Sequence, residues 1–283
     1  MKTISKYGLI LLLPMLLSTT FVAAESAQPT EQLKRHAQLG SLVWADLYTS
    51  DVNASLDFYT KTFAWTVKKF GKDSAKYHIL YDGEQPIAGV LGRSAERNKT
   101  DNALWIGSIA TDDVQANVDR ASQNQATILM QPHDFALYGK RAVIADPQGG
   151  VIALLDLNEN NKAHQKISNK WDWAQLFSVD IQKSATFYQS SFNYRIEKVA
   201  PQQSSLYLIQ QDEIQASIVK LPAAFEQRDR WVNFIEVEDL AKTLTAAVKN
   251  GAEIIHQPEG DALAIISDPN GAFLGLTEQE GEE

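Results

Sequence analysis

Two short runs of alternating residues place aromatic rings on either side of one polar group, and these positions are the best suited to chemistry. The two sets are Trp44, Asp46 and Tyr48, and Trp173, Gln175 and Phe177. Side chains two positions apart in a β-strand point to the same face, so each set would line one face of a strand. Rings around a polar anchor commonly hold a small organic ligand. Core filling by the same rings is the alternative, and both interpretations stay open.

Asp46 is the acidic member of the first set, and three roles are open for its carboxylate. It could be a polar group of a binding pocket, an ordinary strand residue with satisfied hydrogen bonds, or a metal ligand or general base. Glu236 occupies a similar place near the end of the chain. One carboxylate does not make a metal site, because a divalent ion needs several ligands.

Cysteine and histidine do not complete a metal site in the sequence. The chain has no cysteine, which excludes disulfides, thiolate nucleophiles and cysteine-based zinc or iron–sulfur sites. The five histidines form no i, i+4 pair and no other spacing typical of metal ligands. They are His36, His78, His133, His164 and His256.

An internal repeat provides the elements that must position these residues. Asp51–Trp65 recurs as Asp180–Tyr194, Trp105–Val114 as Trp231–Leu240, Asn124–Pro132 as Asn250–Pro258, and Asp146-Pro147 as Asp268-Pro269. The spacing between equivalent residues falls in steps from 129 to 122 residues along the chain. The repeat therefore predicts two copies of one domain, with the shortening placed in loops.

Within each copy, the pattern predicts a strand, a helix and further strands, twice over. Residues 41–49 alternate like a strand, 53–65 have helical spacing with Asn53 or Ser55 available as the N-cap, and 77–92 are typical of a hairpin. We expect domain 1 over residues 39–157 and domain 2 over residues 170–279. A polar lead-in would cover 25–38 and a polar linker 158–169.

The phrase Asp-Pro-x-Gly closes the last hairpin of each copy. Asp146-Pro147-Gln148-Gly149 and Asp268-Pro269-Asn270-Gly271 place Asp, Pro and Gly where a type I turn prefers them. The motif therefore predicts a turn in each copy, and catalysis by Asp146 or Asp268 is the alternative.

In their order, these landmarks resemble the vicinal oxygen chelate superfamily, which includes glyoxalase I, the bleomycin resistance proteins and the extradiol dioxygenases. The matching stretches are Trp44–Trp65, Trp105–Val114 and Ala145–Leu154, with weaker versions in the second copy. The resemblance implies an α+β fold of two tandem glyoxalase-like domains. Each domain would consist of two β-α-β-β-β modules that form a curved mixed sheet around a cleft. In the enzymes of the superfamily, a divalent metal is held in that cleft.

The positions at which the superfamily carries its metal ligands hold unsuitable residues here. The first-strand positions, usually His or Gln, are Trp44, Ile106, Trp173 and Val232. The last-strand positions, usually Glu, are Ala88 or Gly89, Ala153, Ala216 or Ser217, and Gly275. The resemblance thus implies no metal at the usual place, and we predict no cofactor unless a divalent metal is bound at a relocated site.

The start and the overall charge of the chain bear on location and partners. Residues 1–24 combine Lys2 and Lys6 with an apolar run and small residues at its end, which is typical of a signal peptide, with an uncleaved membrane anchor as the alternative. We expect a periplasmic or secreted protein without a stable membrane anchor after cleavage. The net charge of −9 argues against nucleic-acid binding. Two fused copies favour a monomer.

Three functions remain open on the sequence. The first hypothesis is an exported protein of the glyoxalase and bleomycin-resistance type that binds a small organic molecule in an aromatic-lined cleft. The second is an atypical lyase, isomerase or dioxygenase with a relocated metal or none. The third is an interaction module with vestigial clefts. Whether the protein is an enzyme is not decided by the sequence.

Overall fold

The computed structural model describes residues 39–70, 77–93, 103–135, 139–157, 170–199, 205–221 and 228–279. Domain 1 contains β1 (Leu42–Thr49), α1 (Val52–Phe63), β2 (Thr66–Lys69), β3 (Tyr77–Asp82), β4 (Gln85–Gly92), β5 (Leu104–Thr111), α2 (Val114–Gln123), β6 (Thr127–Phe135), β7 (Gly139–Ala145) and β8 (Val151–Leu157). Domain 2 contains β9 (Trp171–Ser178), α4 (Ile181–Phe192), β10 (Arg195–Lys198), β11 (Leu206–Gln210), β12 (Glu213–Lys220), β13 (Arg230–Val237), α5 (Leu240–Lys249), β14 (Glu253–His256), β15 (Leu263–Ser267) and β16 (Phe273–Glu278). The predicted signal peptide, lead-in and linker lie outside the described residues.

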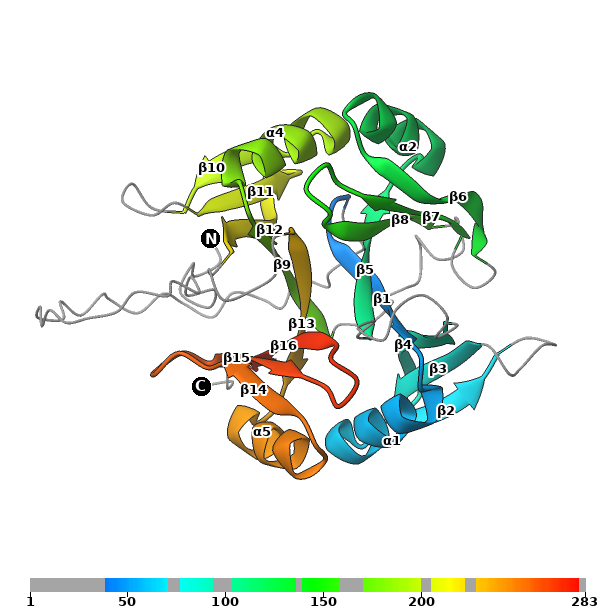
Figure 1. Ribbon diagram of the computed structural model, residues 1–283, viewed down its shortest axis with the longest axis vertical. Helices are drawn as coiled ribbons and strands as arrows, with labels where there is room; N and C mark the ends of the chain where they lie inside the picture. Colours follow the sequence, from blue (N-terminus) through cyan, green and yellow to red (C-terminus); the bar gives the residue numbers. More distant parts are fainter. Residues whose placement is uncertain are drawn as a thin grey trace, which may run out of the picture.

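Each domain is built on one eight-stranded mixed sheet, and the two sheets have matching strand orders (Figure 1). The orders are β2-β3-β4-β1-β5-β8-β7-β6 and β10-β11-β12-β9-β13-β16-β15-β14. β1 runs parallel to β4 and antiparallel to β5, and β5 runs parallel to β8. The same pairings recur among β9, β12, β13 and β16. The predicted fold class, two tandem domains of paired β-α-β-β-β modules, is confirmed.

An aspartate is the N-cap of each of the four helices in the described part of the chain. The carboxylates of Asp51, Asp113, Asp180 and Asp239 accept hydrogen bonds from backbone N–H groups of the first turn, which satisfies donors that have no partner within the helix. The prediction of Asn53 or Ser55 as the first N-cap was wrong. Ser55 is already inside α1, where its buried hydroxyl donates to Thr49 Oγ1 at 3.1 Å.

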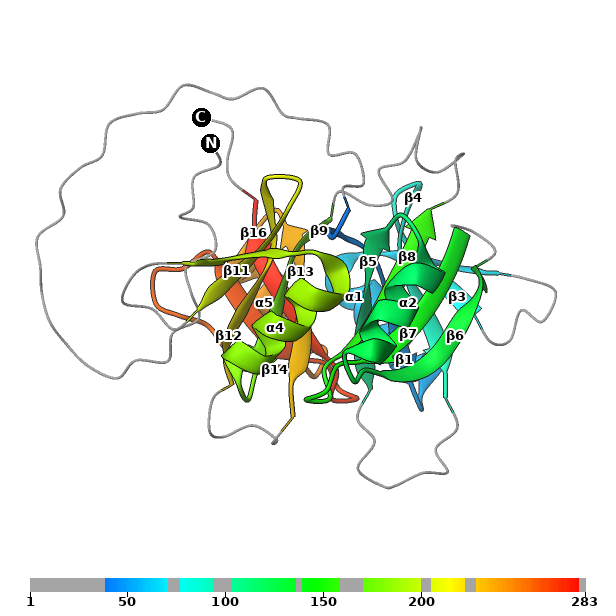
Figure 2. The ribbon, with the colours of Figure 1, turned by 90° about the horizontal axis from the view of Figure 1, so that it is seen from above.

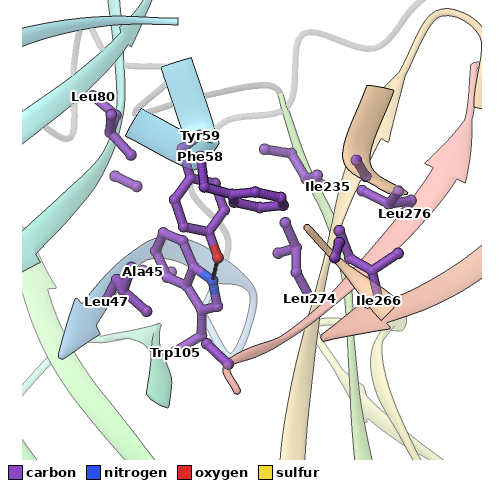
Figure 3. Packing of buried hydrophobic residues seen from close by; sticks show 14 of the residues in the cluster. Ala45, Leu47, Phe58, Tyr59, Leu80, Trp105, Ile235, Ile266, Leu274 and Leu276 are labelled. Carbon is purple, nitrogen blue, oxygen red and sulfur yellow. Dashed lines mark hydrogen bonds between the residues drawn. The ribbon is translucent and has the colours of Figure 1, made fainter. Parts of the chain in front are cut away.

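The two domains pack through their helix-bearing faces and share their cores. Helix α1 contacts α5 and α2 contacts α4, so the helix pairs lie at opposite ends of the molecule (Figures 1 and 2). One core cluster joins Ala45, Leu47 and Phe58 of domain 1 to Ile235 and Leu274 of domain 2, together with other residues of both. Figure 3 shows Phe58 reaching across from α1 toward this second sheet. Neither domain completes its core alone.

Equivalent residues of the two copies meet at the centre of this interface. Gly107 of β5 and Asn233 of β13 hold the same place in the repeat, and a Cβ atom added to Gly107 would collide with the Asn233 side chain. The copies are therefore related by an approximate two-fold axis that passes between β5 and β13. None of the helices in the described part of the chain is long and apolar enough to cross a membrane.

Candidate binding site

The predicted face of β1 points away from the shared core. Ala45 and Leu47 pack into the interface, so the alternating residues Trp44, Asp46 and Tyr48 line the opposite, concave face of the sheet. Trp44 and Asp46 are completely buried, whereas Tyr48 is half-buried. The indole Nε1 of Trp44 donates to Asp46 Oδ1 at 3.2 Å. The structure thus brings together the three residues predicted for this domain.

Arg141 is the partner that sequence reasoning missed. It lies on β7, only 3% exposed, and its Nη1 is 2.8 Å from Asp46 Oδ2. This is an ion-pair distance, although the N–H is not aimed at the oxygen and Oδ2 accepts no hydrogen bond among the described residues. The same Nη1 donates to the Tyr48 hydroxyl at 3.3 Å. The alternation of residues along β7 was the available signal in the sequence. Ala142 and Ile144 pack into the core, so Arg141, at the alternate position, faces the other side of the sheet.

Two further rings complete the surroundings of this ion pair. The hydroxyl of Tyr77 donates to Asp46 Oδ1 at 2.8 Å. The Tyr77 ring meets Phe135 edge-to-face at a centroid distance of 6.1 Å, and the Arg141 guanidinium lies 5.2 Å from the centre of the Phe135 ring. Tyr48, Tyr77 and Phe135 are all half-buried. A buried charged pair on the concave face of the sheet is therefore bordered by partly accessible aromatic rings.

The charge states in this cluster follow from burial and from the neighbouring groups. Burial acts to lower the pKa of Arg141, but Asp46, Tyr48 and Tyr77 together raise it above the ordinary value. Burial raises the pKa of Tyr48, with Asp46 adding to the rise and the Arg141 charge opposing it. At neutral pH this cluster therefore contains a guanidinium cation and a neutral phenol.

The residues at the superfamily's metal-ligand positions in domain 1 lie on this same face of the sheet and do not suit a metal. Ile106 is in register with Asp46, while Ser108 is in register with both Trp44 and Ala153. A Cβ atom on Gly89 would collide with Asp46 Oδ1 and with Tyr77. Indole, alkyl and glycine positions supply no ligand atoms. Within the described ranges, no group of three or more His, Asp or Glu side chains could hold a metal ion.

The equivalent face of domain 2 is filled by apolar packing. Trp173 and Phe177, predicted to line a cleft, belong to a buried cluster with Tyr207, Val232, Phe234 and neighbouring residues. A side chain at Gly275, the usual position of the last-strand ligand, would collide with the Phe234 ring. Gln175 is 5% exposed, and its Nε2 has no partner among the described residues. In this domain the structure favours the core-filling interpretation.

The place of Arg141 in the repeat is taken by Leu263 in domain 2, so the second face has no equivalent cation. Glu236, the other carboxylate considered, lies on β13 in register with Thr277 and is partly exposed. The structure does not bring Glu236 to Asp46, because the two residues lie on the sheets of different domains. The polar chemistry of the clefts is concentrated in domain 1.

The Asp-Pro-x-Gly turns form as predicted and lie at the interface between the domains. Gly149 N–H donates to the Asp146 carbonyl oxygen, and Gly271 N–H donates to that of Asp268. The Asp268 carboxylate accepts a hydrogen bond from Tyr59, whose hydroxyl accepts one from Trp105 Nε1 (Figure 3 draws the Trp105–Tyr59 bond). These aspartates therefore stabilise turns and the interface, which favours the structural interpretation over catalysis.

Comparison with known proteins agrees with this architecture. The model of the Glyoxalase/Bleomycin resistance protein/Dioxygenase superfamily matches residues 41–154 and 170–275. The Anthracycline biosynthesis protein DnrV of Streptomyces peucetius is 25% identical, with 84% of this chain and 93% of that protein covered. The Putative glyoxylase CFP32 of Mycobacterium bovis is 23% identical, with 84% and 94% covered.

Solved structures share the fold at low sequence identity. The Mn(II)-bound glyoxalase from Novosphingobium aromaticivorans matches with a TM-score of 0.56 at 12% identity, covering 85% of this chain and 82% of that one. The 2,3-dioxygenase LapB from Pseudomonas sp. KL28 matches with a TM-score of 0.57 at 11% identity, covering 87% and 94%. With the family model matched in both halves, the chain belongs to the Glyoxalase/Bleomycin resistance protein/Dioxygenase superfamily.

Proposed function

We propose that this protein binds a small organic molecule in the cleft of domain 1, without a metal at the superfamily's usual position. The observation that carries the proposal is the buried pair of Asp46 and Arg141 beneath the half-buried rings of Tyr48, Tyr77 and Phe135. Burying an ion pair costs desolvation energy that packing with apolar residues avoids, as domain 2 illustrates. A function in ligand recognition gives a reason to keep the pair.

The surroundings of Asp46 argue against the alternative of an atypical lyase, isomerase or dioxygenase with this carboxylate as base or metal ligand. Its Oδ1 already accepts hydrogen bonds from Trp44 and Tyr77, and its Oδ2 faces the Arg141 cation. Both oxygens of this carboxylate are therefore already engaged by neighbouring groups of the chain, which leaves neither directed at a substrate or a metal. Binding makes better use of this arrangement than proton transfer does.

The proposal includes export to the periplasm or secretion, and a monomeric state. Residues 1–24 support export by their composition, and the absence of cysteine suits an oxidising compartment. The helix faces of both domains already cover each other within one chain, which supports a monomer. Mass spectrometry of protein recovered from separated cell fractions tests export, and a mature mass that starts near residue 25 is expected.

Two measurements test the central proposal. Elemental analysis of protein purified without chelator, with thermal melts in the presence of Mn²⁺, Fe²⁺, Ni²⁺ or Zn²⁺, should give no stoichiometric metal and no stabilisation. A thermal-shift screen of small aromatic compounds should identify ligands that raise the melting temperature of the wild type. The Arg141→Met variant should lose this stabilisation. Arg195→Met, a control at an exposed arginine of domain 2, should keep it. A stoichiometric metal with stabilisation would instead favour an enzyme with a relocated site.

The relatives support small-molecule chemistry only in a general way. DnrV and DauV are named for anthracycline biosynthesis, and CFP32 is named as a putative glyoxylase. These names concern organic compounds rather than macromolecules, which agrees with a small-molecule ligand for this chain. The identity of that ligand has to come from the chemistry of the cleft.

A further inference from the structure

One edge of the Arg141 guanidinium has no partner in the protein. Nη1 is engaged by Tyr48 and faces Asp46, but Nε and Nη2 have no hydrogen-bond partner among the described residues, although Arg141 is only 3% exposed. A buried donor without a partner destabilises the folded state, because it has lost its hydrogen bonds to water. Two such donors on one buried group indicate that something other than the chain satisfies them.

The geometry of the open edge restricts what can bind there. The guanidinium is planar, and the N–H groups of Nε and Nη2 project from it in parallel, as a fork that matches two oxygens of one carboxylate. Asp46 cannot supply them, since it approaches Nη1 on another side and its Oδ1 is engaged by Trp44 and Tyr77. Among the described residues no group occupies this fork, and its two donors match the two oxygens of a carboxylate.

A second polar group on the same face also lacks a partner. Ser108 Oγ is completely buried, without a hydrogen-bond partner in the described part of the chain, and Ser108 is in register with Trp44 and Ala153. Ile106 and Val143 pack on this face beside Ala153. This face of the sheet thus combines hydrogen-bonding groups without a partner with flat and apolar side chains, a combination that suits an amphipathic ligand.

From this arrangement, and resting on the proposed function, we infer that the ligand of domain 1 is an aromatic or flat apolar carboxylate. Its two oxygens accept hydrogen bonds from Nε and Nη2 of Arg141, and its apolar body lies against Tyr77 and Phe135. Asp46 holds the guanidinium in place through Nη1 and leaves the opposite edge free. Domain 2 does not bind such a ligand, since Leu263 replaces the arginine.

Calorimetric titration with 2-naphthoate and with its neutral analogue 2-naphthamide tests this inference. The wild-type protein should bind 2-naphthoate at least about tenfold more tightly than 2-naphthamide, because only the carboxylate gives charge-assisted bonds to both donors. Arg141→Lys keeps the charge opposite Asp46 but removes the fork, so 2-naphthoate affinity should fall about tenfold or more. Arg195→Met in domain 2 is the matched control and should change neither affinity.

A readout that needs no substitution protects the test against a misfolded variant. Nitrogen-15 NMR of the arginine side chains should show one Nε–H signal that shifts on addition of 2-naphthoate and hardly at all with 2-naphthamide. Equal binding of both compounds, unaffected by Arg141→Lys, would overturn the carboxylate inference and leave the proposed binding function intact. No binding of either compound at millimolar concentration would count against both.

Discussion

The hydroxyl of Tyr59 in domain 1 donates a 2.9 Å hydrogen bond to the carboxylate of Asp268 in domain 2. Tyr188 of domain 2 makes the same bond, at 2.9 Å, to Asp146 of domain 1. Each tyrosine also accepts a hydrogen bond of 2.8 Å from an indole N–H, of Trp105 and Trp231 respectively. Both chains of bonds are buried, so each copy of the repeat anchors the turn that closes the other copy.

Removal of one tyrosine hydroxyl should destabilise the whole protein. Tyr59→Phe leaves the buried Asp268 Oδ2 without its donor and Trp105 Nε1 without its acceptor, for an expected loss of about 1–3 kcal/mol in the free energy of unfolding. Tyr188→Phe should behave alike. Because α1 and α4 lie at opposite ends of the molecule (Figure 1), the two losses should add in the double variant. Urea unfolding followed by tryptophan fluorescence measures them.

Tyr81→Phe provides the matched control for these variants. Tyr81 lies on β3 and is half-buried, and its hydroxyl makes no hydrogen bond among the described residues. The substitution should leave the free energy of unfolding within about 0.5 kcal/mol of the wild type. If Tyr59→Phe cost no more than this control, the bond to Asp268 would not contribute to stability.

Stability should fall with rising pH through the titration of Asp146. Burial raises the pKa of Asp146 to about 6, and the nearby Asp229 carboxylate adds to the rise. The folded protein then holds this proton more tightly than the unfolded chain, whose carboxyl pKa is about 4. The resulting stabilisation is fully present below about pH 4 and is lost as the pH rises through 6.

Comparison of the wild type with Asp146→Asn isolates this effect from all other carboxylates. The difference in unfolding free energy, wild type minus variant, should decrease between about pH 4 and 6.5, because the amide does not titrate. Asp229→Asn removes a neighbouring negative charge and should shift the decrease to lower pH. Parallel pH curves for the wild type and Asp146→Asn would contradict the prediction.

Gly89 should tolerate no side chain, because Asp46 and Tyr77 fill the space beside its Cα atom. A methyl group there would collide with Asp46 Oδ1 and with Tyr77, which are hydrogen-bonded to each other. Gly89→Ala should therefore cost about 1–3 kcal/mol and weaken ligand binding. On the same strand, Gly92→Ala places its Cβ 3.3 Å from Val52 Cγ2, a far milder contact, and should retain binding. Thermal melts and ligand titration compare the two.

The aspartate that precedes each helix should matter more than the polar residues inside the first turn. Asp51→Ala removes the 2.9 Å bond from the Ala54 N–H and should cost about 1 kcal/mol. Asn53→Ala, at an exposed position within α1, should change the stability by less than about 0.5 kcal/mol. Equal losses for the two variants would favour the original assignment of the cap.

Sequence reasoning identified the fold because its signals are local or repeated. The duplicated landmarks and the alternation of Trp44, Asp46 and Tyr48 need no knowledge of distant contacts. The pairing of Asp46 with Arg141 does require such knowledge. These residues come from different modules, which meet only when the eight-stranded sheet is assembled. Similarly, Asp146 was assigned to a turn, but nothing local to the turn indicates that Tyr188 of the other copy reaches it.

The core that joins the two copies also explains how they could become different. Both sheets carry their helices on the faces that meet in the shared interior, so their concave faces point outward in opposite directions (Figure 1). A substitution in the shared core affects the packing of both domains, whereas a substitution on one concave face affects only the domain that carries it. The two concave faces accordingly differ: that of domain 2 is filled by packing around Phe234, whereas that of domain 1 contains the Asp46–Arg141 pair. Domain 2 therefore stabilises domain 1 through the shared core without repeating its buried charges.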